Sequence, residues 1–237
     1  MNKLEELLAG LKPIEGKELE DFWMQVNENK EKQAKELEVY FHKKQIDEEE
    51  IYDVLLTYAD SEDRWQLFAD FVENGNLTDK AFNVGLKEAW TCGKGTGDFR
   101  ALAYFKKADK ILMMNDEELA YYSSLPDRVT LYRGCNKGEV EDEDSALGIS
   151  WTIERKVAEF FAFRFEQTDT AVYSIEVEKK NIDALFLNRK EYEAICLGVC
   201  EEDITLITDT PTEYYNEFIE EHKKEQYNMI HNLKDTK

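Results

Sequence analysis

The chain has 237 residues, 42% of them hydrophobic, and a formal net charge of −22 from 30 basic and 52 acidic residues. This length and composition suit one large domain with a sizeable core, or a domain with an extension. So acidic a surface repels phosphate backbones and anionic lipid, which argues against broad electrostatic binding of nucleic acid or of a membrane.

The N-terminal sequence MNKLEELLAG has acidic residues where a signal peptide would have an apolar stretch. No run of about 18 consecutive apolar residues occurs, so we expect no transmembrane helix and a cytoplasmic location. The cysteines form no CxxC pair and no ligand cluster with histidine, which predicts reduced thiols and no metal site. They are Cys92, Cys135, Cys196 and Cys200.

Residues 1–120 form the helical part of the predicted fold. Apolar residues recur at spacings of three and four in four segments, which are residues 18–45, 47–59, 62–74 and 78–91. Thr78 stands where an N-cap is wanted, and Gly75 stands where a helix should end. We expect the apolar faces of these helices to pack against one another.

A glycine-rich segment, TCGKGTG (residues 91–97), follows the last of these helices. A phosphate-binding loop requires a glycine, four residues and then Gly-Lys-Ser/Thr, whereas Gly93-Lys94 is followed here by Gly95. The segment therefore predicts a linking loop.

From Val129 onward the pattern changes to short strands, with one central helix at residues 154–165 and a final helix after Pro211. The predicted strands are residues 129–134, 148–152, 170–178, 183–187, 193–199 and 204–208. The acidic run at residues 139–146 predicts a solvated loop. The fold class is α+β, with a helical region over residues 1–120 and a β-rich domain over residues 121–237 that ends in a helix.

Three motifs follow one another in this β-rich domain. Arg133 ends a predicted strand and Gly134 follows it. Residues 150–152 end another strand and lead into a helix. Glu191 and Glu193 open a third, with both carboxylates on one side because side chains in a strand alternate. Glu-x-Glu also occurs at residues 139–141 and 176–178, so the motif has value only in this order.

The order LYRG, then GISWT running into a helix, then FLNRKEYEAI resembles the arginine–serine–glutamate class of mono-ADP-ribosyltransferases, of the bacterial and phage type. The resemblance covers residues 125–200. It implies a split β-sheet core with a cleft for NAD+. Trp151 departs from the family's usual Ser-Thr-Ser, and strand alternation predicts that it turns into the core.

The resemblance also implies roles for the motif residues. Glu193 matches the catalytic glutamate, which stabilises a cationic, oxocarbenium-like transition state and binds a ribose hydroxyl. Glu191 matches the residue that engages and deprotonates the acceptor, and a glutamate there is typical of enzymes that modify arginine. Arg133 contacts the NAD+ phosphates. Gly134 lets the backbone approach the nicotinamide amide.

The remaining implied residues support the site. Ser150 and Thr152 are implied in the binding of NAD+, Ser150 by hydrogen-bonding toward Glu193 and the ribose. Arg164 is either a second phosphate contact or a surface ion pair. Phe160 and Phe161 are expected in the core in preference to stacking on nicotinamide.

We therefore expect an enzyme that uses NAD+ as a substrate, needs no metal, and transfers ADP-ribose to an acceptor protein. A basic acceptor protein would fit the net charge of −22. Within the same enzyme class, an NAD+ glycohydrolase uses water as the acceptor. The alternative from another class is a non-catalytic acidic binding protein that mimics nucleic acid. The Lys-, Glu- and Asn-rich composition suits a protein made within, or delivered into, a bacterial host cell.

Overall fold

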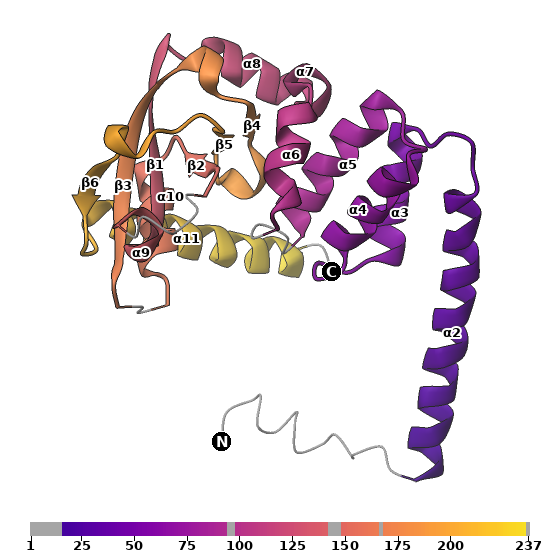
Figure 1. Ribbon diagram of the computed structural model, residues 1–237. Coiled ribbons are helices and arrows are strands. Elements are labelled where there is room, and N and C mark those ends of the chain that lie inside the picture. Colours follow the sequence, from indigo (N-terminus) through magenta and orange to yellow (C-terminus); the bar gives the residue numbers. More distant parts are fainter. Residues whose placement is uncertain (1–15, 94–97, 142–147, 166–167, 236–237) are drawn as a thin grey trace, which may run out of the picture.

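The computed structural model describes residues 16–93, 98–141, 148–165 and 168–235. Figure 1 shows a group of helices from the first half of the chain beside a sheet from the second half. The helices of the first half are α2 (Lys17–Phe41), α3 (Glu48–Tyr58), α4 (Arg64–Asn74), α5 (Asp79–Cys92), α6 (Arg100–Lys107), α7 (Lys110–Met113) and α8 (Asp116–Ser124).

The second half forms one antiparallel sheet with the strand order β4-β5-β2-β1-β3-β6. Its strands are β1 (Arg128–Asn136), β2 (Ser150–Thr152), β3 (Thr170–Glu178), β4 (Ala184–Phe186), β5 (Glu193–Ile195) and β6 (Thr205–Thr208). The helices and 3-10 turns between and after them are α9 (Gly138–Glu141), α10 (Arg155–Phe163), η1 (Lys179–Asn181), η2 (Asn188–Lys190), η3 (Glu201–Asp203) and α11 (Glu213–Asp235). The predicted α+β class is confirmed.

The N-terminal helices begin and end at the residues that local chemistry favours. The Thr78 side chain accepts a hydrogen bond from the backbone of Ala81 and caps α5. Gly75 ends α4 in the left-handed region, with φ of 74°, where glycine carries no steric penalty. The apolar faces pack mutually, as expected, with Phe68 and Leu86 completely buried in one cluster.

The same hydrophobic cluster includes residues of the sheet. Phe186 and Ile195, from β4 and β5, are buried with Phe105 and Met113 from the helical half. A second cluster on the sheet contains Trp151, which is 2% exposed, so its predicted place in the core is confirmed. One hydrophobic core is therefore formed jointly by the N-terminal helices and strands β4 and β5.

The strands differ in how far they pair. β1 pairs with β3 over nine residues, whereas β1 and β2 share a single pair, Tyr132 with Thr152. β2 pairs in turn with β5, where Thr152 lies opposite Glu193. β1 and β2 are therefore adjacent at one point only, and α10 packs against both of them.

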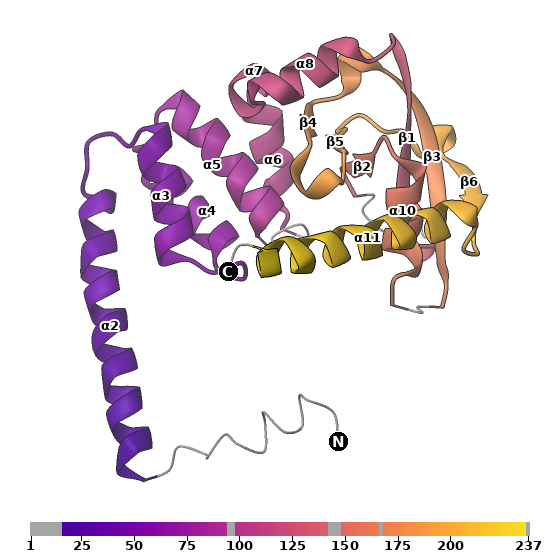
Figure 2. The same cartoon turned by 180° about the vertical axis from the view of Figure 1, so that it is seen from behind.

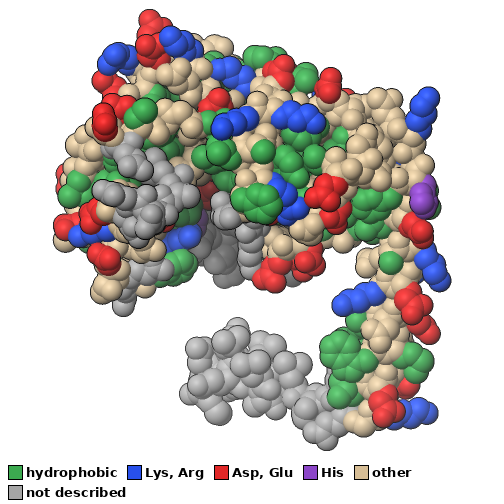
Figure 3. Space-filling view, in the orientation of Figure 1, with side chains coloured by type: hydrophobic (Ala, Val, Ile, Leu, Met, Phe, Trp, Pro, Cys, Tyr) green, Lys and Arg blue, Asp and Glu red, His purple; other side chains and the backbone are tan. Residues whose placement is uncertain are grey.

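Two long helices lie outside this core. Figures 1 and 2 show α2 projecting away from the sheet, and α11 running from the sheet toward the helical half. Figure 3 shows hydrophobic side chains on the outer part of α2, where Phe22, Trp23 and Met24 are 46–55% exposed. No helix in the described part of the chain has the length and apolarity needed to span a membrane.

Candidate functional site

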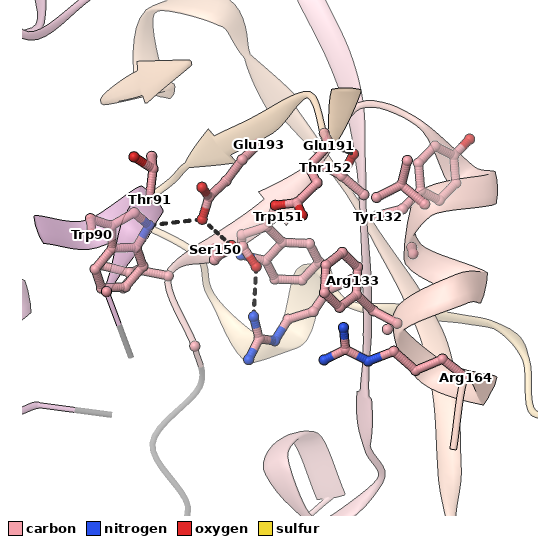
Figure 4. Close-up of a pocket in the computed structure, with 17 residues that line it drawn as sticks. Trp90, Thr91, Tyr132, Arg133, Ser150, Trp151, Thr152, Arg164, Glu191 and Glu193 are labelled. Atoms are coloured by element: carbon pink, nitrogen blue, oxygen red, sulfur yellow. Dashed lines mark hydrogen bonds between the residues drawn. The ribbon is translucent and has the colours of Figure 1, made fainter. Parts of the chain in front are cut away.

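A cavity of about 510 Å³ lies between the end of α5, strands β1 and β2, helix α10 and the turn before β5. Its volume falls in the range of small-molecule sites, which is about 300–1,000 Å³. All seven residues proposed from sequence line it: Arg133, Gly134, Ser150, Thr152, Arg164, Glu191 and Glu193. Figure 4 shows the side chains of these residues around the cavity, apart from Gly134, which has none.

Glu193 is the first residue of β5, and its carboxylate is held by two donors. The Ser150 hydroxyl donates to Oε1 at 2.5 Å, and the indole nitrogen of Trp90 donates to the same oxygen at 2.8 Å (Figure 4). Strand pairing brings Ser150 and Glu193 onto neighbouring strands of the sheet. Both hydrogen bonds are charge-assisted, which makes them stronger than neutral ones when the carboxylate is ionised.

Glu191 is not part of the strand, contrary to the sequence-based expectation. It follows the 3-10 turn η2 in a right-handed helical conformation, and Tyr192 then takes a positive φ of 48°. Strand alternation therefore does not explain why both carboxylates line the cavity. The turn does, and Thr152 holds it by donating its hydroxyl to the Glu191 carbonyl at 2.7 Å.

The backbone of this turn is strained. Lys190 and Tyr192, on either side of Glu191, both have positive φ values, of 58° and 48°. For residues other than glycine, such conformations cost about 1–3 kcal/mol each and persist where the surrounding structure enforces them. They are enriched at functional sites, and here they set the direction of Glu191.

Arg133 lies inside β1, because the strand continues to Asn136 and does not end at the Arg-Gly pair as predicted. Its guanidinium is 18% exposed and donates to the Ser150 carbonyl at 2.6 Å and to the Glu139 carboxylate at 2.6 Å. Glu139 belongs to α9, so this part of the acidic run is not the solvated loop that was expected. Residues 142–146 of that run lie outside the described residues.

Gly134 has a packing role that the sequence did not indicate. A Cβ atom at this position would lie 1.9 Å from the carbonyl oxygen of Ala158 and 2.7 Å from the amide nitrogen of Ala162. The close approach that requires glycine is therefore that of α10 to β1. Gly134 also lines the cavity, together with Ala158 of α10.

The end of α10 brings a second guanidinium to the cavity. Arg164 stacks over Phe161 at 4.4 Å and over Phe165 at 4.7 Å. Phe161 lines the cavity, whereas Phe160 stacks on Phe218 of α11 with ring centroids 4.6 Å apart. Both phenylalanines were expected in the core, but both are only half-buried and outside the core clusters, and Phe161 faces the site.

Sequence reasoning missed the contribution of α5. Trp90, Thr91 and Gly93 all line the cavity. The glycine-rich segment marked this place in the chain, but it was interpreted as a linker. Thr91 and Cys92 belong to α5, Gly93 follows them, and residues 94–97 lie outside the described residues.

Within the described ranges, no group of three or more His, Cys, Asp or Glu side chains is arranged to hold a metal ion. Comparisons of the chain with models of protein families, with curated proteins and with solved structures find no match. The function is therefore inferred from the site's own residues.

Proposed function

We propose that the protein is an ADP-ribosyltransferase that cleaves NAD+ and transfers ADP-ribose to a protein arginine. The observation that carries this proposal is the Glu193 carboxylate, fixed by Ser150 in a cavity that two arginines also line. The single residue pair between β1 and β2 is compatible with the split sheet of that class. A basic acceptor protein fits the net charge of −22.

The chemistry suits these groups. The bond between ribose C1′ and the nicotinamide nitrogen breaks, and nicotinamide leaves with the electron pair, which neutralises its positive charge. Positive charge develops on the ribose, and a fixed carboxylate such as Glu193 stabilises it electrostatically. Arg133 and Arg164 supply the guanidinium groups that suit diphosphate oxygens.

Glu191 is the proposed base for the acceptor. The acceptor nitrogen forms a bond to C1′ and loses a proton, which the Glu191 carboxylate takes up. This role is supported by its place on the cavity wall beside Glu193, in a turn whose backbone is constrained at both neighbouring residues.

The test is incubation of the protein with NAD+ labelled in the adenylate phosphate and a cell lysate, followed by gel analysis. Wild type should label acceptor proteins, and Glu193→Gln should lower the rate by about a hundredfold or more, as removal of one stabilising group typically does. Equal labelling by both proteins would reject the assignment of Glu193.

Glu191→Gln separates transfer from hydrolysis. For a transferase, this substitution should abolish protein labelling and leave the release of nicotinamide to water. If Glu191→Gln changes nothing while wild type hydrolyses NAD+, the glycohydrolase is the better description. If calorimetry gives no heat of NAD+ binding to wild type, the site is not catalytic and the acidic binding protein is favoured.

A further inference from the structure

Trp90, in the last turn of α5, contacts the candidate catalytic carboxylate although 103 positions separate it from Glu193. Its indole N–H and the Ser150 hydroxyl converge on one oxygen, Oε1 (Figure 4). Because the two donors come from different parts of the fold, they hold Oε1 from two directions. Ser150 alone would fix it less completely.

The indole is itself held in place. Trp90 is 4% exposed and packs edge-on against Phe105, with centroids 5.0 Å apart, and against Trp65, with centroids 6.0 Å apart. Arg64 anchors the end of α5 by donating to the Cys92 carbonyl at 2.9 Å. The donor is therefore oriented before any ligand binds, and such preorganisation is what makes a fixed dipole effective in catalysis.

Thr91, the residue after Trp90, makes a separate contact with the same site. The Asn188 side-chain amide donates to the Thr91 hydroxyl at 3.3 Å. Asn188 opens the η2 turn that leads to Glu191. One end of α5 thus contacts both the carboxylate of Glu193 and the turn that carries Glu191.

We propose that Trp90 is a positioning residue for Glu193, so that the N-terminal helices complete a site that the sheet alone leaves unfinished. The proposal rests on the proposed function for the role of the carboxylate. It assigns to α5 a contribution to catalytic rate, because a donor to the ionised carboxylate favours its charged form and fixes its direction.

The first experiment does not depend on NAD+. Trp90→Phe retains an aromatic ring and removes the N–H, and it is combined with Glu193→Ala in a double-mutant cycle of urea unfolding. We expect the unfolding equilibrium constant of the double variant to differ about tenfold from the value that the single effects predict, as for a hydrogen bond to a charged group. Additive effects, within about twofold, would overturn the proposal.

The second experiment measures NAD+ turnover. Trp90→Phe should lower kcat about tenfold or more with KM for NAD+ changed by less than about twofold, because the contact acts on the transition state. The acidic limb of the kcat profile should move to higher pH, since the charged carboxylate has lost a donor. Trp23→Phe removes an indole N–H from the exposed part of α2, away from the cavity and from the rings that hold Trp90, and it should change neither quantity.

The outcomes are distinct. Loss of stability in Trp90→Phe with kcat and the acidic limb unchanged would show that the contact is only structural, and would overturn the proposal. If wild type does not turn over NAD+, the proposed function fails, and the double-mutant cycle alone decides whether Trp90 holds the carboxylate.

Discussion

Gly134 is a residue whose identity is set by backbone packing. A side chain there would meet the Ala158 carbonyl at 1.9 Å, and backbone cannot move aside as a flexible side chain can. We expect Gly134→Ala to lower the free energy of unfolding by about 1–3 kcal/mol, the usual cost of overpacking. Urea unfolding measures this change.

The matched control is Gly138→Ala. Among the described residues, no atom outside its chain neighbours and its own helix lies within 4 Å of the position of its Cβ, so the change should stay within about 0.5 kcal/mol. Equal effects of the two substitutions would mean that α10 does not lie against β1 at this distance.

Glu139 forms an ion pair with Arg133, whose guanidinium the proposed function assigns to the NAD+ phosphates. Its carboxylate lies 2.6 Å from Nη2 of Arg133, where it competes with an anionic ligand. Glu139→Gln should therefore strengthen NAD+ binding up to about fivefold, since a partly exposed ion pair contributes about 0.2–1 kcal/mol. Isothermal titration calorimetry gives the dissociation constants.

Glu141→Gln is the control for that prediction. Glu141 lies on the same short helix, but its carboxylate accepts a hydrogen bond from Tyr173 at 3.1 Å. The same gain in both variants would indicate a general charge effect and would contradict direct competition by Glu139.

The sequence singled out seven residues that line the cavity, but it did not indicate their geometry. Glu139 belonged to a Glu-x-Glu pair that served only as a counterexample, and its ion pair with Arg133 depends on where α9 folds back. The two carboxylates of Glu191 and Glu193 were expected on one strand, yet positive φ at Tyr192 separates turn from strand. Alternation describes regular strands and cannot foresee such a turn.

At the scale of elements, Glu118 of α8 joins the helices to the sheet. It is 1% exposed, forms an ion pair with Lys87 of α5 at 2.5 Å, and accepts backbone hydrogen bonds from Asn115 and Leu187. Removing one partner leaves an uncompensated buried charge, so Glu118→Ala should lower the free energy of unfolding by about 3–5 kcal/mol.

Glu176→Ala is the comparison for Glu118→Ala in chemical denaturation. Its ion pair with Arg128 joins two side chains that are 60–68% exposed, so its loss should cost less than about 1 kcal/mol. A cost for Glu118→Ala no greater than this would show that the buried pair does not hold α5 and α8 together.

The elements that the sequence predicted well are those whose pattern is local. β3 covers the predicted residues 170–178, and α10 differs from its prediction by two residues or fewer at each end. β1 was predicted too short because Gly134 resembles a strand end, whereas the glycine accommodates the helix that crosses it. The short helices α6 and α7 had only been assigned to a helical region, and α8 (Asp116–Ser124) crosses the predicted end of that region at residue 120.

At the scale of the whole molecule, the candidate site forms where the helices and the sheet meet. A local sequence pattern does not predict which distant segments pack together there. The hydrogen bond between Trp90 and Glu193 depends on packing between segments 103 residues apart. The resemblance, confined to residues 125–200, could not include a residue of α5. The sequence therefore predicted the half of the site that belongs to the sheet.

The long helix α2 offers a test of which parts of the molecule carry stability. Its C-terminal end is anchored, with Phe41 stacked on Phe71 at 4.2 Å, while Trp23 near its other end is 55% exposed. Phe41→Ala should therefore lower the free energy of unfolding by about 2 kcal/mol or more, and Trp23→Ala should change it by less than about 0.5 kcal/mol. Neither residue lines the cavity, so the NAD+ dissociation constant should be the same in both variants. A large loss of stability in Trp23→Ala would mean that the outer part of α2 packs against the molecule, and would contradict the projecting arrangement in Figure 1.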